Sequence, residues 1–228
     1  MACKRVCLWS GPRNVSTALM YAFAQREDTK VVDEPLYGHY LRVSRAKHPG
    51  RKEILAAMET DGGKVIREII LGPCDYPVLF CKNMAHHLVG LNRTFMQYTT
   101  NVLLIRDPAE MLPSLAKNLP RPKLRDTGLK IQVEIFKELN RIGEFPPVLD
   151  ARLLLLNPAG VLQELCKRIG IDFQERMLHW EPGPRPEDGP WAKYWYENLH
   201  QSTGFRPYQP KTEPFPPALL PLLKQCRP

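Results

Sequence analysis

Residues 5–23 have the sequence Arg-Val-Cys-Leu-Trp-Ser-Gly-Pro-Arg-Asn-Val-Ser-Thr-Ala-Leu-Met-Tyr-Ala-Phe. Residues 5–9, which are apolar after Arg5, predict a short buried strand, and the apolar run at 18–23 predicts the start of a helix. A loop between a strand and a helix directs several backbone N–H groups toward one point, where the helix dipole also favours an anion. Arg13 adds a positive charge there, and Ser16 and Thr17 add hydroxyl donors. This loop therefore has the outline of a phosphate-binding site.

The loop differs from the loop that binds nucleoside triphosphates, which requires a lysine directly before its hydroxyl residue. Gly11 is followed five positions later by Ser16, and no lysine lies between Lys4 and Lys30. This difference disfavours a Mg-dependent kinase or hydrolase. Taken alone, the segment would equally fit an ordinary polar corner, because capping residues are common where helices begin.

A second basic position follows another predicted strand. Residues 101–105 form an apolar run that ends at Arg106, and a helix-like segment at 109–119 carries Ser114 eight residues after that arginine. Pro108 fits the first turn of this helix, because that turn needs no N–H from it. Open parallel sheets bind ligands at the carboxyl ends of their strands, where Arg106 is expected to lie.

Together the two segments resemble the cytosolic and Golgi sulfotransferase superfamily, whose sulfuryl donor is 3′-phosphoadenosine-5′-phosphosulfate (PAPS). In that family a loop of the type Pro-Lys/Arg-Ser-Gly-Thr-Thr binds the 5′-phosphosulfate, and an arginine with a serine eight residues later holds the 3′-phosphate. Arg106 and Ser114 match the second site, and Val15 stands where the family usually has glycine. The residues that match the loop are Pro12, Arg13, Asn14, Ser16 and Thr17, and the resemblance implies that these residues, together with Val15, bind the donor.

The resemblance extends over most of residues 5–206. Residues 148–152 resemble the last strand of the family, 161–170 resemble the amphipathic helix after it, and 202–205 lies where many members have a segment that closes over the donor. Apolar residues at helical spacing give the helix at 161–170 a stripe that is expected to face the core, namely Val161, Leu162, Leu165 and Ile169. The resemblance implies a three-layer α/β/α fold with a central parallel sheet, similar to P-loop NTPases, in one domain spanning residues 1–228. The alternation of strand and helix patterns also favours a parallel sheet with helices on both faces.

The remaining segments complete this expected order. Further strands are predicted at 30–33 and 77–82, and further helices at 52–60, 64–71, 91–98 and 129–142. The C-terminal residues 182–228 contain eleven of the 23 prolines, a density that resists regular structure. Because the aromatic residues at 191–196 need burial, an irregular strap over the core is favoured over a disordered tail.

Two strand ends supply candidate catalytic groups. Sulfuryl transfer places negative charge on the oxygen between sulfur and the departing 5′-phosphate, so Arg13, the loop N–H groups and Lys82 are candidate stabilisers. A solvated strand-end lysine is the alternative for Lys82. Some sulfotransferases that resemble this chain use a glutamate as base at the position of Glu34, and burial would raise the pKa of that carboxyl and make it a better base. Alternatively, Asp33 or Glu34 binds a cationic acceptor group or caps the next turn.

His86 and His87 are the competing candidates for the base. Other branches of the superfamily use a histidine two residues after a strand-end lysine, but Met84 occupies that position here. A pair of histidines after a strand is more often structural, because ring nitrogens readily bond nearby carbonyls.

These features predict a PAPS-dependent sulfotransferase that releases adenosine 3′,5′-bisphosphate and requires no metal. Plant proteins in which a similar domain precedes an aminotransferase-like domain also resemble this chain. They suggest a small acceptor that is amino-acid-like or an enamine, sulfonated at oxygen, nitrogen or carbon. The alternatives are a kinase-like phosphotransferase and a noncatalytic nucleotide-binding module.

The length of 228 residues and the 43% hydrophobic content fit one domain with a sizeable core. The net charge of +8 suits an anionic partner, and it equally suits nucleic acid or an anionic membrane surface. No basic stripe with interleaved aromatic residues predicts nucleic-acid binding. No apolar run approaches the length that spans a bilayer, and only four apolar residues follow Lys4 and Arg5 before the loop, so a cytoplasmic protein is expected. The six cysteines show neither zinc-site spacing nor a disulfide pattern. The sequence leaves open whether the protein is a monomer or a homodimer.

Overall fold

The computed structural model describes residues 3–227. A five-stranded sheet forms its centre, with all neighbouring strands parallel in the order β2-β3-β1-β4-β5. The strands are β1 (Lys4–Ser10), β2 (Thr29–Asp33), β3 (Val78–Met84), β4 (Thr100–Ile105) and β5 (Val148–Asp150). Ser10 at the end of β1 pairs with Met84 on one side and Leu104 on the other, so three carboxyl ends meet at one edge. The predicted parallel sheet is confirmed.

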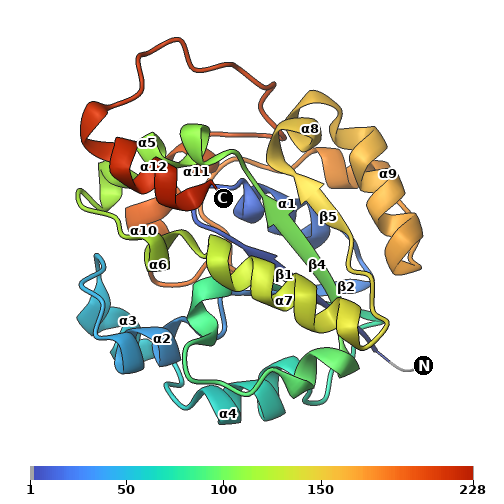
Figure 1. Cartoon of the computed structure of the whole chain (residues 1–228). Helices are drawn as coiled ribbons and strands as arrows, with labels where there is room; N and C mark the ends of the chain where they lie inside the picture. The colour runs from blue at the N-terminus through green and yellow to red at the C-terminus, as the bar shows by residue number, and fades with distance from the viewer. Residues whose placement is uncertain (1–2, 228) are drawn as a thin grey trace.

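Helices connect the strands and cover both faces of the sheet. The α-helices are α1 (Ser16–Ala24), α2 (Tyr37–Ser44), α3 (Arg51–Ala57), α4 (Gly62–Val65), α5 (Pro108–Asn118), α6 (Leu124–Thr127), α7 (Leu129–Arg141), α8 (Ala151–Leu156), α9 (Pro158–Ile169), α10 (Ala192–Trp195), α11 (Glu197–His200) and α12 (Leu220–Cys226). The 3₁₀ segments are η2 (Ala85–Leu88), η3 (Thr94–Tyr98), η4 (Glu175–Leu178) and η5 (Pro217–Leu219), and η1 (Ile66–Ile70) is a π-helical turn that continues α4. Figure 1 shows α7 in front of the sheet and α1 behind it, which makes three layers. No helix among residues 3–227 is long and apolar enough to cross a bilayer.

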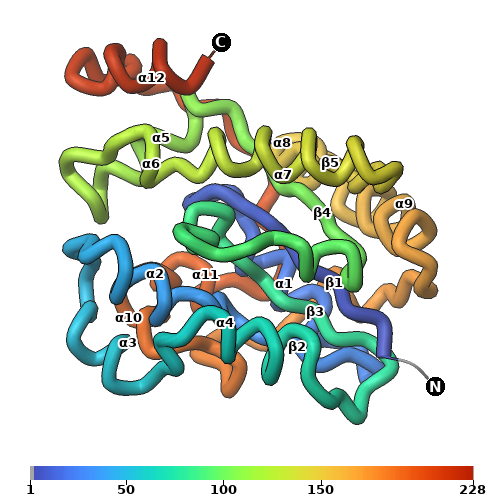
Figure 2. Tube along the Cα trace, turned by 60° about the horizontal axis from the view of Figure 1, so that its bottom comes forward, coloured from blue at the N-terminus to red at the C-terminus, as the bar shows by residue number. Residues whose placement is uncertain are grey.

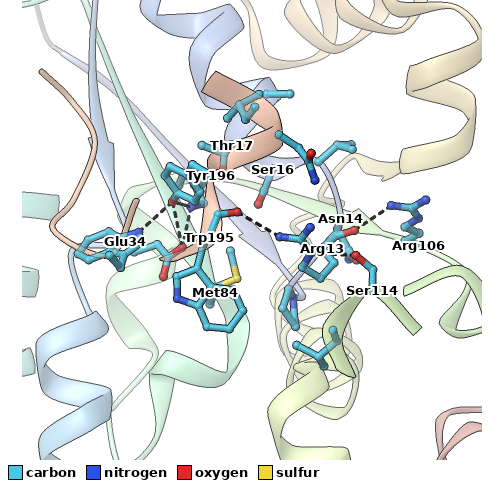
Figure 3. A pocket seen from close by; sticks show the side chains of 18 of the residues that line it. Arg13, Asn14, Ser16, Thr17, Glu34, Met84, Arg106, Ser114, Trp195 and Tyr196 are labelled. Carbon is cyan, nitrogen blue, oxygen red and sulfur yellow. Dashed lines mark hydrogen bonds and ion pairs between the residues drawn. The ribbon is translucent and has the colours of Figure 1, made fainter. Parts of the chain in front are cut away.

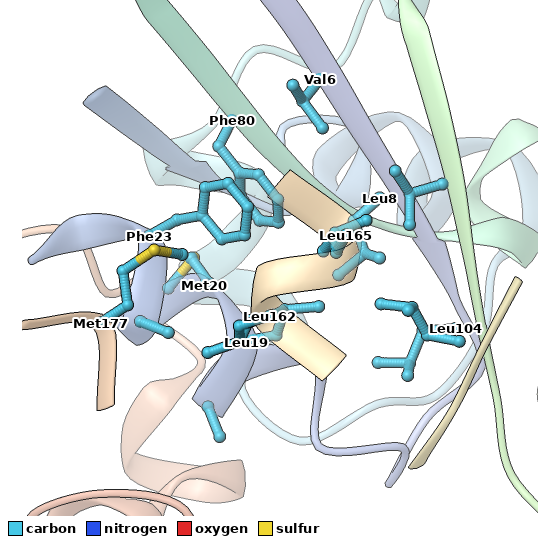
Figure 4. Close-up of a cluster of buried hydrophobic side chains, with 14 of the residues drawn as sticks. Val6, Leu8, Leu19, Met20, Phe23, Phe80, Leu104, Leu162, Leu165 and Met177 are labelled. Carbon is cyan, nitrogen blue, oxygen red and sulfur yellow. The ribbon is translucent and has the colours of Figure 1, made fainter. Parts of the chain in front are cut away.

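The core on one face packs α1 and α9 against the sheet (Figure 4). Phe23 of α1 stacks on Phe80 of β3, with ring centroids 4.0 Å apart. Leu162 and Leu165 lie on the inward face of α9, as its apolar spacing predicted, and both are buried. Full burial of each such side chain contributes about 1.5–3 kcal/mol. This packing holds α1 at the carboxyl end of β1.

The core on the other face packs α7, α4 and the turns η1 to η3 against the sheet. Trp9 of β1 contacts Phe95 edge to face, and its indole Nε1 donates to the buried Asn101 side chain at 2.9 Å. Gln132 of α7 donates to the carbonyl oxygens of Trp9 and Leu104 at 3.0 and 2.9 Å. These bonds satisfy carbonyl groups at the ends of β1 and β4, next to the loop that follows β1. They therefore hold the carboxyl edge of the sheet in place.

Several predicted boundaries differ from the structure for local reasons. The strand predicted at 148–152 ends at Asp150, because the Asp150 carboxylate accepts from the backbone N–H groups of Arg152 and Leu153 and begins α8. The helix predicted at 91–98 is the short 3₁₀ segment η3. In the helix predicted at 64–71, the α-helical part ends at Val65 and continues as the π-helical turn.

The C-terminal segment is irregular, as predicted, and packs over the carboxyl edge of the sheet. Trp191 and Tyr196 are buried against Tyr37 and Leu41 of α2. Helix α12, which the proline density did not predict, lies beside α5 (Figure 2). Its Leu222 packs against that helix. We refer to residues 182–227 as the strap.

Candidate active site

The loop between β1 and α1 has a left-handed backbone at two residues. Arg13 has φ 61° and Val15 has φ 58°. This region is strained for a β-branched residue and open to glycine. Val15 therefore adopts a left-handed backbone conformation. Glycine, the usual residue at this position in the family that the sequence resembles, takes that conformation at little cost. Gly11 is required for a different reason, because a Cβ there would lie 2.5 Å from the carbonyl oxygen of Thr127.

The same loop is tied to β4 through Asn14. Its Nδ2 donates to the Leu104 carbonyl oxygen at 3.2 Å, and its buried Oδ1 has no hydrogen-bond partner within residues 3–227. Ser16 is the first residue of α1 and is also buried. The loop thus places backbone N–H groups and hydroxyls at the helix N-terminus, where anions bind favourably.

Arg13 and Arg106 lie together around Ser114 (Figure 3). Arg13 Nε donates to Ser114 Oγ at 2.9 Å, and Arg13 Nη1 donates to the Trp195 carbonyl oxygen at 3.2 Å. Arg106 Nη1 donates to the Arg13 carbonyl oxygen at 2.9 Å, and Arg106 Nε pairs with Glu110 at 3.1 Å. Burial and the charge of Arg106 lower the pKa of Arg13. Two guanidinium groups at this proximity favour an anion between them.

The serine contacts a different arginine from the one that the sequence spacing indicated. Ser114 bonds Arg13 of the β1–α1 loop, whereas Arg106 reaches the loop backbone. Helix α5, which follows Arg106 and carries Ser114, begins as predicted. The Asp107 side chain accepts from the N–H of Ala109 at 2.8 Å and caps the helix. The anion-binding position predicted at the β1–α1 loop and the one predicted at Arg106 and Ser114 therefore form one continuous surface.

Lys82 lies at the centre of a buried polar cluster. Its Nζ donates to Asp33 Oδ1 at 2.7 Å, to Glu34 Oε1 at 2.6 Å and to the Tyr196 hydroxyl at 2.6 Å. Because three donors meet three acceptors, the ammonium is fully paired. Burial opposes its charge, but the carboxylates of Asp33 and Glu34 outweigh burial and raise the pKa of Lys82. The alternative of a solvated strand-end lysine is wrong, since this side chain is fully buried.

Glu34 occupies a turn that directs its carboxylate back toward β3. The residue has φ 40°, its N–H donates to the Lys82 carbonyl oxygen at 2.8 Å, and its carbonyl accepts from Tyr37 N–H at 2.9 Å. Burial raises the pKa of Glu34 to about 6; the charge of Lys82 opposes that rise and Asp33 adds to it. A carboxylate with this pKa is suited to accept a proton near neutral pH.

The two histidines that compete for the role of base are buried and neutral. Burial lowers the pKa of His86 to about 3, and burial with the neighbouring His86 holds the pKa of His87 well below its ordinary value. The His87 ring stacks on Tyr37 and on Tyr40 at 4.7 Å. Its Nδ1 lies 3.9 Å from Glu34 Oε2. These low pKa values make both imidazoles weak bases.

One cavity of about 310 Å³ joins these groups. Its walls come from the β1–α1 loop, the ends of β2, β3 and β4, helix α5 and the strap. The lining includes Pro12, Arg13, Asn14, Val15, Ser16, Thr17, Glu34, Lys82, His86, His87, Arg106, Ser114, Trp191, Trp195 and Tyr196. All the predicted site residues therefore line the same cavity. Within the described part of the chain, no group of three or more His, Cys, Asp or Glu is placed to hold a metal ion.

The resemblance placed residues 202–205 over the donor, and Ser202, Gly204 and Phe205 line the cavity. Sequence reasoning did not identify the contribution of Trp195 and Tyr196. Trp195 and Tyr196 bond Arg13 and Lys82, although they lie more than a hundred residues away in sequence. The one available signal is the aromatic cluster at 191–196 in a proline-rich segment, which predicted burial but no position.

The sequence matches known proteins over nearly its whole length. A family model described as "Sulfotransferase domain" matches residues 4–218. Two proteins of Arabidopsis thaliana, named branched-chain-amino-acid aminotransferase-like protein 2 and protein 1, are 43% and 41% identical over 221 residues, 96% of this chain. The chain spans only 39% and 40% of their lengths.

Solved structures match the fold at low sequence identity. The sulfotransferase domain from the Synechococcus PCC 7002 olefin synthase gives a TM-score of 0.57 at 14% identity, covering 98% of this chain and 95% of that one. The sulfotransferase domain from the curacin biosynthetic pathway gives a TM-score of 0.54 at 14% identity, covering 98% and 97%. The predicted three-layer fold is confirmed by these likenesses.

Proposed function

The chain belongs to the sulfotransferase-domain family, and we propose that its cavity transfers a sulfuryl group from PAPS to a small acceptor, releasing adenosine 3′,5′-bisphosphate. One observation carries the proposal. The cavity brings an anion-binding loop, a second arginine and a buried carboxylate with a raised pKa into contact with the same space. These are the groups that a donor with two phosphate positions and a proton-releasing acceptor require.

The donor end of the cavity has the polarity that a doubly phosphorylated adenosine requires. The backbone N–H groups at the start of α1, with Ser16 and Thr17, would hold the 5′-phosphosulfate. Arg106 and Ser114 would hold the 3′-phosphate. Burial, together with the nearby charge of Arg106, lowers the pKa of Arg13, and this proximity of two cations supports an anion between them.

The bound donor supplies an activated sulfuryl group, and the side chains of this protein supply positioning and charge. Arg13 and the loop N–H groups stabilise the negative charge that develops on the leaving 5′-phosphate oxygen, a contribution of about 3 kcal/mol for each such donor. Glu34 accepts the proton of the acceptor. Lys82 keeps this carboxylate oriented and holds a positive charge next to the reacting groups.

The acceptor end is formed by rings rather than by free charges. Trp191, Trp195, Tyr37 and the neutral His86 and His87 line it. Because Lys82 is already fully paired, this end favours an acceptor that attacks as a neutral nucleophile. The names of the plant relatives refer to an amino-acid aminotransferase-like protein. Both observations support an amino-acid-like or enamine acceptor.

A transfer assay with ³⁵S-labelled PAPS tests the proposal. Small hydroxy acids, amino acids and dehydroamino acids would be presented in parallel, with ATP labelled at its terminal phosphate as the alternative donor. We expect label transfer from PAPS to at least one acceptor, and loss of that transfer in Glu34→Gln with unchanged binding of adenosine 3′,5′-bisphosphate.

Two results would contradict the proposal. Transfer of phosphate from ATP would identify a phosphotransferase. Tight binding of adenosine 3′,5′-bisphosphate with no transfer to any acceptor, equal in wild type and Glu34→Gln, would identify a noncatalytic module. A surface variant, Glu27→Gln, is the matched control, because it removes the same carboxylate charge far from the cavity.

A further inference from the structure

The strap reaches both ends of the cavity through two consecutive residues. The carbonyl oxygen of Trp195 accepts from Arg13 Nη1 at 3.2 Å, and the hydroxyl of Tyr196 accepts from Lys82 Nζ at 2.6 Å. Figure 3 shows Trp195 and Tyr196 side by side, with the contact between Trp195 and Arg13 as a dashed line. The Tyr196 side chain is buried, and its ring lies 5.0 Å from the Lys82 ammonium.

We propose that Tyr196 is a positioning residue that fixes Lys82 and Asp33 so that Glu34 keeps one carboxylate oxygen free to take the proton of the acceptor. This inference rests on the proposed function, because it assigns a task to a residue that bonds the base and its lysine. It concerns Tyr196, which the family motifs identified in the sequence do not include.

The hydrogen bonds of the cluster support this role. The Tyr196 hydroxyl has one proton, which it donates to Asp33 Oδ2 at 2.8 Å, while it accepts from Lys82. Asp33 is thereby held on both oxygens, and Lys82 bonds Glu34 only at Oε1. Glu34 Oε2 makes no hydrogen bond within residues 3–227, and His87 Nδ1 lies 3.9 Å from it. Oε2 is therefore the oxygen available for proton transfer.

The hydroxyl is held in its protonated form. Burial, with the charges of Asp33 and Glu34, raises the pKa of Tyr196 well above its ordinary value, so the group stays a donor. Trp191 Nε1 donates to the same oxygen at 2.9 Å and fixes its direction. The groups that face Glu34 are Lys82 from β3, Asp33 from β2, His87 from η2, Tyr37 from α2 and Tyr196 from the strap.

A separate contact anchors the strap and provides a matched control. The Tyr21 hydroxyl of α1 donates to Asp188 at 2.7 Å, and His200 Nε2 bonds the same carboxylate at 2.9 Å. Removing the Tyr21 hydroxyl weakens the attachment of the strap without touching Lys82 or Glu34. Tyr21→Phe and Tyr196→Phe therefore delete the same atom, one at an anchor and one at the catalytic cluster.

The test measures the protonation of Glu34 directly. Protein labelled with ¹³C at glutamate carboxyls would be titrated by NMR, with the Glu34 signal assigned by its loss in Glu34→Gln. In Tyr196→Phe we expect proton affinity at Glu34 to rise about tenfold, one pH unit, because Asp33 loses a donor and competes for Lys82. The pH at which turnover falls to half on the acidic side of its pH profile should rise by the same amount. The affinity for adenosine 3′,5′-bisphosphate should stay unchanged.

Three results would overturn the inference. The first is a Glu34 titration in Tyr196→Phe that equals wild type. The second is an equal shift in Tyr21→Phe, which would show that strap attachment alone matters. The third result applies if Tyr196→Phe does not fold. Trp191→Phe weakens the hydrogen bonding of the same hydroxyl and should shift the Glu34 titration in the same direction by a smaller amount. An unchanged Glu34 titration in Trp191→Phe would therefore also overturn the inference. Failure of the proposed function is distinct, because wild type would then transfer no sulfuryl group although the titration still reports on Tyr196.

Discussion

Replacement of Lys82 by methionine is expected to destabilise the protein strongly and in a pH-dependent way. The change leaves Asp33 and Glu34 buried without a cation, and breaking a buried pair in this way costs about 3–5 kcal/mol. This is a large part of the roughly 5–15 kcal/mol that stabilises a domain. The melting temperature should fall by about 6–20 °C, from about 2–4 °C per kcal/mol for a chain of this size.

The sign of the pH dependence follows from the raised pKa of Glu34. In wild type, burial raises the pKa of Glu34 from 4.5 to about 6, so its contribution to stability is complete below 4.5 and is lost as pH rises through 6. That contribution is about 2 kcal/mol. Without Lys82 the pKa of Glu34 rises further. The deficit of Lys82→Met relative to wild type should therefore shrink as pH falls from about 8 to about 5, because protonation neutralises the unpaired charges.

Urea unfolding followed by tryptophan fluorescence measures both effects. Lys193→Met is the control, because it removes a lysine from an exposed pair with Glu53, and it should lose far less stability at either pH. The triple change Lys82→Met, Glu34→Gln and Asp33→Asn should recover part of the loss. A Lys82→Met protein as stable as wild type near pH 8, or a deficit that grows toward pH 5, would refute the argument.

Three further outcomes are expected. Val15→Gly should be more stable than Val15→Ala by about 1 kcal/mol in thermal unfolding, because φ 58° strains any residue with a Cβ; the reverse order would argue against the left-handed loop. Turnover should rise with pH through about 6 as Glu34 loses its proton, and a profile that falls in this range would exclude Glu34 as the base. Chelation with EDTA should leave sulfuryl transfer unchanged, and loss of transfer that added Mg²⁺ restores would contradict the metal-free mechanism.

The sheet and the loop could be predicted because local patterns determine them. Continuous apolar runs such as 101–105 bury on both faces and predict strands of a parallel sheet. The spacing of Leu162 and Leu165 predicted the inward face of α9 in the same way. Strand ends then gather at one edge by topology, which is why Glu34 and Lys82 could be expected to meet.

The strap and its contacts depend on long-range packing, which no short pattern encodes. Tyr196 follows a four-residue helix in a proline-rich segment. Its hydroxyl reaches Lys82 only because the aromatic cluster packs against α2. The pairing of Ser114 with Arg13 was missed for a related reason. The resemblance to the family linked Ser114 to Arg106, but the left-handed backbone of Arg13 carries its side chain to Ser114.

The most direct measurement is calorimetric binding of adenosine 3′,5′-bisphosphate and of AMP to wild type and to Arg106→Ala. The account predicts that wild type prefers the doubly phosphorylated nucleotide by at least about tenfold, and that Arg106→Ala removes the preference while binding AMP as before. Arg125→Ala, which removes an exposed arginine outside the cavity, should retain it. Equal affinity of wild type for the two nucleotides would contradict the account.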